Sequence, residues 1–157
     1  MKGGALCLVI VALSGGCRAA FVDERPESAR PAGIADVSSV DLSNPQIVAS
    51  GEFRGRAGHL GQGGVSLVSY DSGVVELRFS ATFESSEVSG PVVLLTGRDF
   101  IGTSINHDAG DLEIGPLEAS SGAQSYFLRN GGDRRNVFVY CKPYGIEVAK
   151  APLQPTP

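Results

Sequence analysis

The chain has 157 residues and a formal net charge of −4, with 13 lysines and arginines against 17 aspartates and glutamates. The basic residues form no cluster long enough to follow a phosphate backbone, so we expect no nucleic-acid partner. The 21 glycines separate short runs of valine, leucine and phenylalanine, and tryptophan is absent. This composition is typical of the turns and short strands of an all-β protein.

The N-terminus has the pattern of a signal peptide. Lys2 supplies a positive charge, and an apolar run of nine residues extends from Ala5 to Leu13. That run has the length of a signal-peptide core and is too short to cross a bilayer. We therefore expect residues 1–16 to be a signal peptide. The protein would then be exported to a bacterial periplasm or cell surface.

Cys17 is a candidate lipidation site. The preceding residues, Leu13-Ser14-Gly15-Gly16, resemble a bacterial lipobox, although the leucine lies one position farther from the cysteine than in that motif. Lipid on Cys17 would anchor the protein to a membrane. Ordinary cleavage after Gly16 or Ala19 is the alternative, because pairs of small residues precede both positions.

The next segment predicts a linker followed by one domain. Residues 17–45 contain several prolines among scattered small and acidic residues, and their few apolar residues show no period. This composition is typical of a flexible linker. We place a single domain at residues 46–153, with a short tail at residues 154–157.

The domain reads as a series of short strands. We predict a first strand over residues 47–54, then a glycine-rich loop over residues 55–64 that carries His59. Residues 65–70 and 74–80 predict a hairpin around Asp71-Ser72-Gly73, since glycine permits a positive φ in the turn. In its second arm, Val75, Leu77 and Phe79 alternate with polar residues, which indicates one buried and one solvated face.

The remaining strands complete an all-β pattern. The run after Pro91, residues 92–95, is apolar at every position and predicts a central strand, and a long loop follows over residues 97–110. Further strands are predicted over residues 111–114, 124–128, 136–142 and 144–149. About eight or nine short strands, with turn signals between them, favour an antiparallel β-sandwich, with a barrel as the alternative.

Six short motifs, in order, resemble those of the DM-thirteen domain, also called the electron-transfer DM-thirteen family. They are Gly51-Glu52-Phe53, Gly90-Pro91-Val92-Val93-Leu94-Leu95, Leu112 to Leu117, Gly122 to Tyr126, Val137 to Lys142, and Ala149 to Leu153. The resemblance implies a β-sandwich related to DOMON-type domains. It also implies a redox role centred on the strand cysteine, which here is Cys141.

Strand geometry alone leaves several roles open for Cys141. It shares one face of its strand with Val137 and Val139, while Lys142 points to the other face. A cysteine among valines is typical of a buried and unreactive core residue. A redox centre, a metal ligand and an intermolecular disulfide are the alternatives.

Loop residues provide weaker candidates for a metal or cofactor site. His59, His107 and Cys141 could together hold a metal or approach a haem edge, if the two long loops meet. Asp108 and Asp111 lie in an acidic stretch that could bind calcium, although its spacing is not that of an EF-hand. Solvated loop side chains are the simpler interpretation of both groups.

Two classes of function follow from these observations. The first is an exported, lipid-anchored domain with an electron-transfer accessory role at Cys141, acting with a redox or envelope protein partner. The second is a non-catalytic envelope module for binding or structure, in which Cys141 is a core residue. Motifs of hydrolases and of phosphate-binding loops are absent from the sequence, which places an enzyme with its own substrate third.

Overall fold

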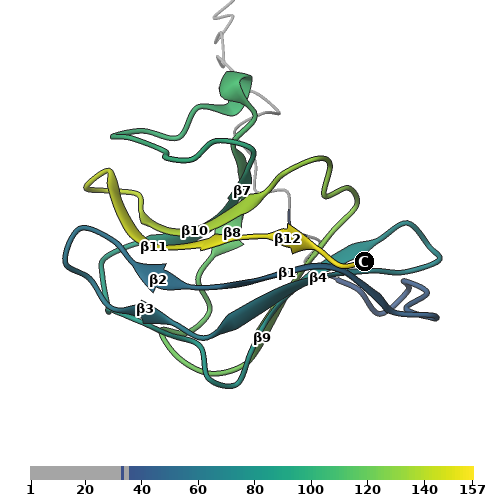
Figure 1. Cartoon of the computed structure of the whole chain (residues 1–157). Helices are drawn as coiled ribbons and strands as arrows, with labels where there is room; N and C mark the ends of the chain where they lie inside the picture. The colour runs from purple at the N-terminus through teal and green to yellow at the C-terminus, as the bar shows by residue number, and fades with distance from the viewer. Residues whose placement is uncertain (1–32, 34–35) are drawn as a thin grey trace, which may run out of the picture.

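A computed structural model describes Gly33 and residues 36–157 (Figure 1). The predicted signal peptide, Cys17 and most of the predicted linker lie outside the described residues. Within the described part of the chain, no helix is long and apolar enough to span a membrane.

The described residues form two five-stranded antiparallel sheets and one small two-stranded ribbon. Sheet A has the order β12-β1-β4-β5-β9, sheet B has the order β2-β11-β10-β7-β8, and β3 pairs with β6. The strands are β1 (Gln46–Glu52), β2 (Arg54–Gly55), β3 (Gly61–Gln62), β4 (Gly64–Ser69), β5 (Val75–Phe79), β6 (Glu84–Ser85), β7 (Pro91–Thr96), β8 (Leu112–Pro116), β9 (Gln124–Leu128), β10 (Asn136–Cys141), β11 (Ile146–Pro152) and β12 (Gln154–Pro155).

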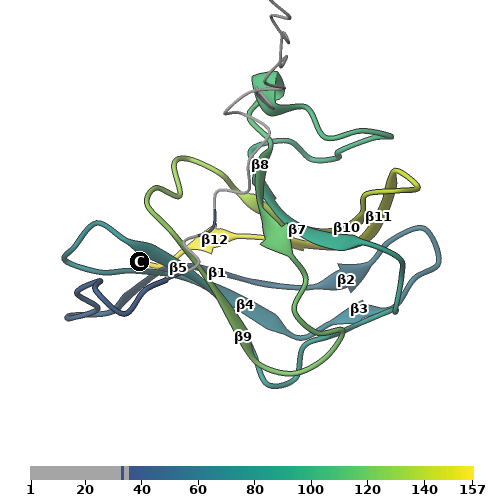
Figure 2. The same cartoon turned by 180° about the vertical axis from the view of Figure 1, so that it is seen from behind.

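The predicted all-β sandwich is confirmed, since the two sheets pack against each other (Figures 1 and 2). The predicted first strand divides at Phe53, so that β1 pairs with β4 in sheet A and β2 pairs with β11 in sheet B. Phe53 itself is buried in the core. The chain therefore changes sheets at a residue whose side chain both sheets cover.

The predicted hairpin is confirmed as β4 and β5. Gly73 adopts a φ of 78°, and its amide donates to the Tyr70 carbonyl across the turn. Leu77 and Phe79 point into the core, as their alternation predicts. The expectation of a solvated opposite face is wrong for Glu76, which is only 4% exposed because neighbouring side chains cover its carboxylate.

The main core lies between the sheets and has an aromatic centre. The rings of Phe53, Phe79 and Phe83 lie within 5.0 Å of one another between centroids, and Tyr126 packs 5.5 Å from Phe79. Such tilted and edge-on contacts add to the stabilisation from buried area. This core contains residues from both sheets and fixes how they face each other.

A second apolar cluster covers the outer face of sheet B. Leu94 and Phe138 lie on this face, and Ile101 and Ile105 from the loop between β7 and β8 pack against them. That loop rises above sheet B and contains the 3-10 turn η2 (His107–Ala109) (Figures 1 and 2). Both faces of β7 are therefore covered, which explains why its sequence is apolar at every position. The strand order β10-β7-β8 confirms its predicted position inside the sheet.

Part of the predicted linker contacts the domain. The Gly33 amide donates to the Ile114 carbonyl at 2.9 Å, and Gly33 forms a bridge with Leu128. The Asn44 side chain donates to the Asp71 carboxylate at 2.5 Å. These contacts join the segment to β8, β9 and the β4–β5 turn.

Candidate functional site

Cys141 lies at the end of β10 and points into the core between the sheets. It is 2% exposed and packs in the same cluster as Val137 and Val139. Its Sγ donates to the Ser89 carbonyl at 3.1 Å. The shared face with the two valines, expected from strand alternation, is confirmed, and any reagent must open the structure locally to reach the thiol.

Lys142 follows Cys141 and points to the opposite face, as expected. Its Nζ donates to both carboxylate oxygens of Glu113 on β8, at 2.9 and 2.8 Å. Glu113 and Phe138 are aligned with the same β7 residue, Leu94, and all three lie across the outer face of sheet B. Lys142 therefore cannot stabilise a thiolate at Cys141 by direct contact.

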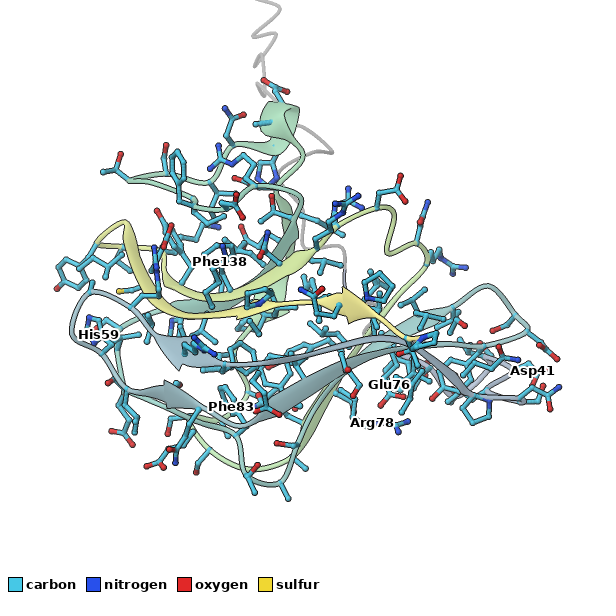
Figure 3. The ribbon with its side chains drawn as sticks, in the orientation of Figure 1. Asp41, His59, Glu76, Arg78, Phe83 and Phe138 are labelled. Atoms are coloured by element: carbon cyan, nitrogen blue, oxygen red, sulfur yellow. The ribbon has the colours of Figure 1, made fainter. Side chains whose placement is uncertain are left out.

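The candidate metal ligands do not gather into a site. His59 lies in the turn between β2 and β3, at one end of the sandwich (Figure 3), whereas His107 belongs to η2. Asp108 is exposed beside His107. In the part of the chain that the structure describes, no group of three or more His, Cys, Asp or Glu residues could hold a metal ion.

Asp111 instead anchors the loop between β7 and β8. Its Oδ1 accepts a hydrogen bond from Thr96 Oγ1 at 2.8 Å, and its Oδ2 accepts one from the Asn106 amide at 2.8 Å. Arg98 Nε lies 3.2 Å from Oδ1 without the alignment of a hydrogen bond, so it contributes charge rather than a bond. With both oxygens engaged and the residue 3% exposed, Asp111 serves as a structural anchor.

The tip of this loop is held against the β10–β11 hairpin. Glu147 accepts a hydrogen bond from the Ile101 amide at 2.6 Å, and Tyr140 donates its hydroxyl to the Gly102 carbonyl at 3.1 Å. Gly145 approaches the Thr103 carbonyl so closely that a Cβ would collide with it. These contacts hold the loop over sheet B.

Two open depressions adjoin Glu113 and Lys142 on the outer face of sheet B. The first, here called the polar chamber, has a volume of about 380 Å³ and is lined by Thr103, Ser104, Ile105, His107, Glu113, Tyr140 and Lys142. The second, the apolar chamber, also has a volume of about 380 Å³ and is lined by Gly90, Pro91, Val92, Glu113, Pro116, Lys142 and Pro143. Both are lined by the Glu113–Lys142 ion pair, and together we call them the two-chamber cleft.

The two partners of this ion pair differ in exposure. The Glu113 side chain is 7% exposed and that of Lys142 is 53% exposed. A buried carboxylate requires a nearby cation, which Lys142 supplies from the solvent side. Sequence reasoning missed the pair because Glu113 and Lys142 are separated by 29 positions and meet only through the order β10-β7-β8.

His107 contributes a second polar group to the polar chamber. Its Nδ1 lies 3.0 Å from the Asp111 carbonyl oxygen, which can only accept a hydrogen bond. Nδ1 therefore carries the proton in this contact, and Nε2 of the neutral ring keeps its lone pair.

Another polar network covers the outer face of sheet A, where Figure 3 shows Glu76 and Arg78. Arg78 donates to both Glu76 oxygens at 3.0 and 2.7 Å, and Ser125 donates to one of them at 2.6 Å. Burial disfavours the charge of Glu76, but the hydrogen bonds from Arg78, Ser125 and Tyr70 outweigh it and lower the pKa to about 2. A cavity of about 310 Å³ lies beside Arg78 on this face. Glu76 already accepts hydrogen bonds from three side chains, whereas Glu113 accepts them from one side chain among the described residues. We therefore place the candidate site in the two-chamber cleft, which retains an acceptor for a ligand.

No family model, curated protein or solved structure matches the chain.

Proposed function

We propose that this protein is a non-catalytic binding module of the bacterial cell envelope and that its ligand site is the two-chamber cleft. The observation that carries the proposal is the Glu113–Lys142 pair, which lies between a polar and an apolar cavity. Small-molecule sites commonly combine apolar walls with a few convergent polar groups. In this proposal Cys141 is a core residue, on the opposite side of sheet B from Lys142.

Export and membrane anchoring are also part of the proposal. They are supported by the sequence pattern of residues 1–16 and by the lipobox-like residues before Cys17. The competing proposal is an electron-transfer accessory role at Cys141, supported by the resemblance to DM-thirteen domains. The burial of the thiol favours the binding module.

Binding in the cleft is tested by NMR with a library of small cationic, neutral and anionic fragments. We expect saturable shifts of backbone amides around both chambers, including Val92 and Thr103. Ser104→Trp, placed in the polar chamber, should weaken that binding, whereas Ser72→Trp in the exposed β4–β5 turn should leave it unchanged. Shifts that gather elsewhere on the protein, or none at all, would refute the proposal.

The role of Cys141 is tested by thiol labelling, with peptide mapping to separate it from Cys17. We expect slow labelling of Cys141 in folded protein at neutral pH and fast labelling in denaturant, because the thiol is buried. Fragment binding should be unchanged in Cys141→Ala. Rapid labelling of the folded protein would favour the redox proposal instead.

A further inference from the structure

The two-chamber cleft contains a buried carboxylate with a single cationic partner. Among the described residues, Lys142 is the one side chain that donates hydrogen bonds to Glu113. A carboxylate offers about four lone-pair positions, of which the two bonds from Lys142 occupy about half. Glu113 therefore retains the capacity to accept further hydrogen bonds from a ligand.

The walls of the apolar chamber do not supply those hydrogen bonds. Pro91, Pro116 and Pro143 line it and have no backbone N–H, and Val92 adds only an aliphatic side chain. The chamber is an open depression, with Pro116 and Pro143 exposed, and it places hydrocarbon beside one buried anionic acceptor. A ligand that complements such a site has an aliphatic chain ending in a positively charged donor.

The Lys142 side chain is itself an aliphatic chain that ends in a positively charged donor. Lys142 lines both chambers, and its ammonium group lies on Glu113. Because the side chain is 53% exposed, its ammonium can return to water, and an exposed lysine is only weakly held by such a pair. A second ammonium arriving from outside would keep Glu113 neutralised during the exchange.

We propose that the two-chamber cleft binds a primary alkylammonium group, such as that of an aliphatic amine, on Glu113, and that Lys142 occupies the site as an internal substitute for this ligand. The proposal rests on the function proposed above and names its ligand class. An anionic ligand in the same place would be repelled by Glu113. A neutral ligand that displaced Lys142 would leave a buried charge without a partner.

The experiment uses n-butylammonium as the probe. In the wild-type protein we expect weak, saturable NMR shifts at the Val92 amide. Lys142→Met keeps a stem of similar length and removes the competing ammonium. Because an exposed pair of this kind is worth up to about 1 kcal/mol, we expect about three- to sixfold tighter binding in this variant. The melting temperature of this variant should also rise with added n-butylammonium.

Two kinds of control separate the chemistry from general hydrophobic binding. n-Butanol has the chain without the charge, and tetramethylammonium has the charge without an N–H donor, so neither should reproduce the effect. Glu113→Gln keeps the shape of the side chain and leaves only the half-exposed Lys142 unpaired, so it should fold and lose the n-butylammonium response. This variant tests the proposal even if Lys142→Met fails to fold.

The possible results distinguish this inference from the function on which it rests. If neutral or anionic fragments bind in the cleft and n-butylammonium does not, the ligand class is wrong and the binding module stands. An n-butylammonium response that persists in Glu113→Gln also overturns the inference. If no fragment of any charge binds in the cleft, both proposals fail.

Discussion

Glu76 makes the folding stability of this protein depend on acid pH. Its carboxylate accepts hydrogen bonds from Tyr70 in the β4–β5 turn, Arg78 on β5 and Ser125 on β9. Despite the opposing effect of burial, these bonds lower its pKa from an ordinary 4.5 to about 2. A group whose pKa is lowered by folding stabilises the native state above its unfolded pKa, and this contribution is lost as the pH falls through the folded pKa.

The size of the effect follows from the two pKa values. The fall from 4.5 to about 2 is about 2.5, and each pKa unit corresponds to about 1.4 kcal/mol, which sets an upper limit of about 3.5 kcal/mol. The Arg78 side chain is 48% exposed, so solvent screens the interaction. We therefore expect Glu76→Gln to lower the free energy of unfolding by about 1–2 kcal/mol near neutral pH.

Urea unfolding followed by circular dichroism measures this effect at several pH values. The difference between wild type and Glu76→Gln should be constant above about pH 4.5 and should decrease to nearly zero near pH 2. Glu87→Gln, at an exposed position, should show no such pH-dependent difference. A difference between wild type and Glu76→Gln that stays the same from neutral pH to about pH 2 would refute the assignment of the shift to Glu76.

Two further predictions concern the loop between β7 and β8 and the proposed lipid anchor at Cys17. Gly145→Ala should lower the free energy of unfolding by about 1–3 kcal/mol and speed amide hydrogen exchange around Thr103, because the residue has a φ of 64° and a Cβ would collide with the Thr103 carbonyl. Gly58→Ala, with a φ of 80° but open space around the added carbon, should cost less, and an equal cost in both variants would show that the contact with Thr103 is unimportant. Cys17→Ala should release the protein from the membrane fraction of cells, and continued membrane association would contradict lipid anchoring at this residue.

Local features of the fold could be predicted because they depend on neighbouring residues. The sequence predicted a strand at residues 124–128, the same residues that form β9, and alternation placed Cys141 on the face of Val137 and Val139. The turn at Gly73 followed from the conformational freedom of glycine. A period of two and a turn residue are properties of a few consecutive positions, so they need no knowledge of the rest of the chain.

The shortest strands could not be predicted because they are too short to carry a local pattern. β3, β6 and β12 each contain two residues, which is too few to show any alternation. Their strand conformation comes from pairing with partners elsewhere in the chain, as when Gln154 and Pro155 pair with β1.

The candidate site was decided by the tertiary structure alone. Alternation places Lys142 opposite Cys141, but only the order β10-β7-β8 brings its ammonium to Glu113. The same holds for Glu76, which alternation assigns to a solvated face and which hydrogen bonds from Tyr70 and Ser125 bury. The sequence by itself determined an all-β chain and the direction of the side chains in strands long enough to show alternation, such as β5 and β10. Which charges meet depends on how strands distant in sequence are ordered, because that order brings together side chains that no local pattern relates.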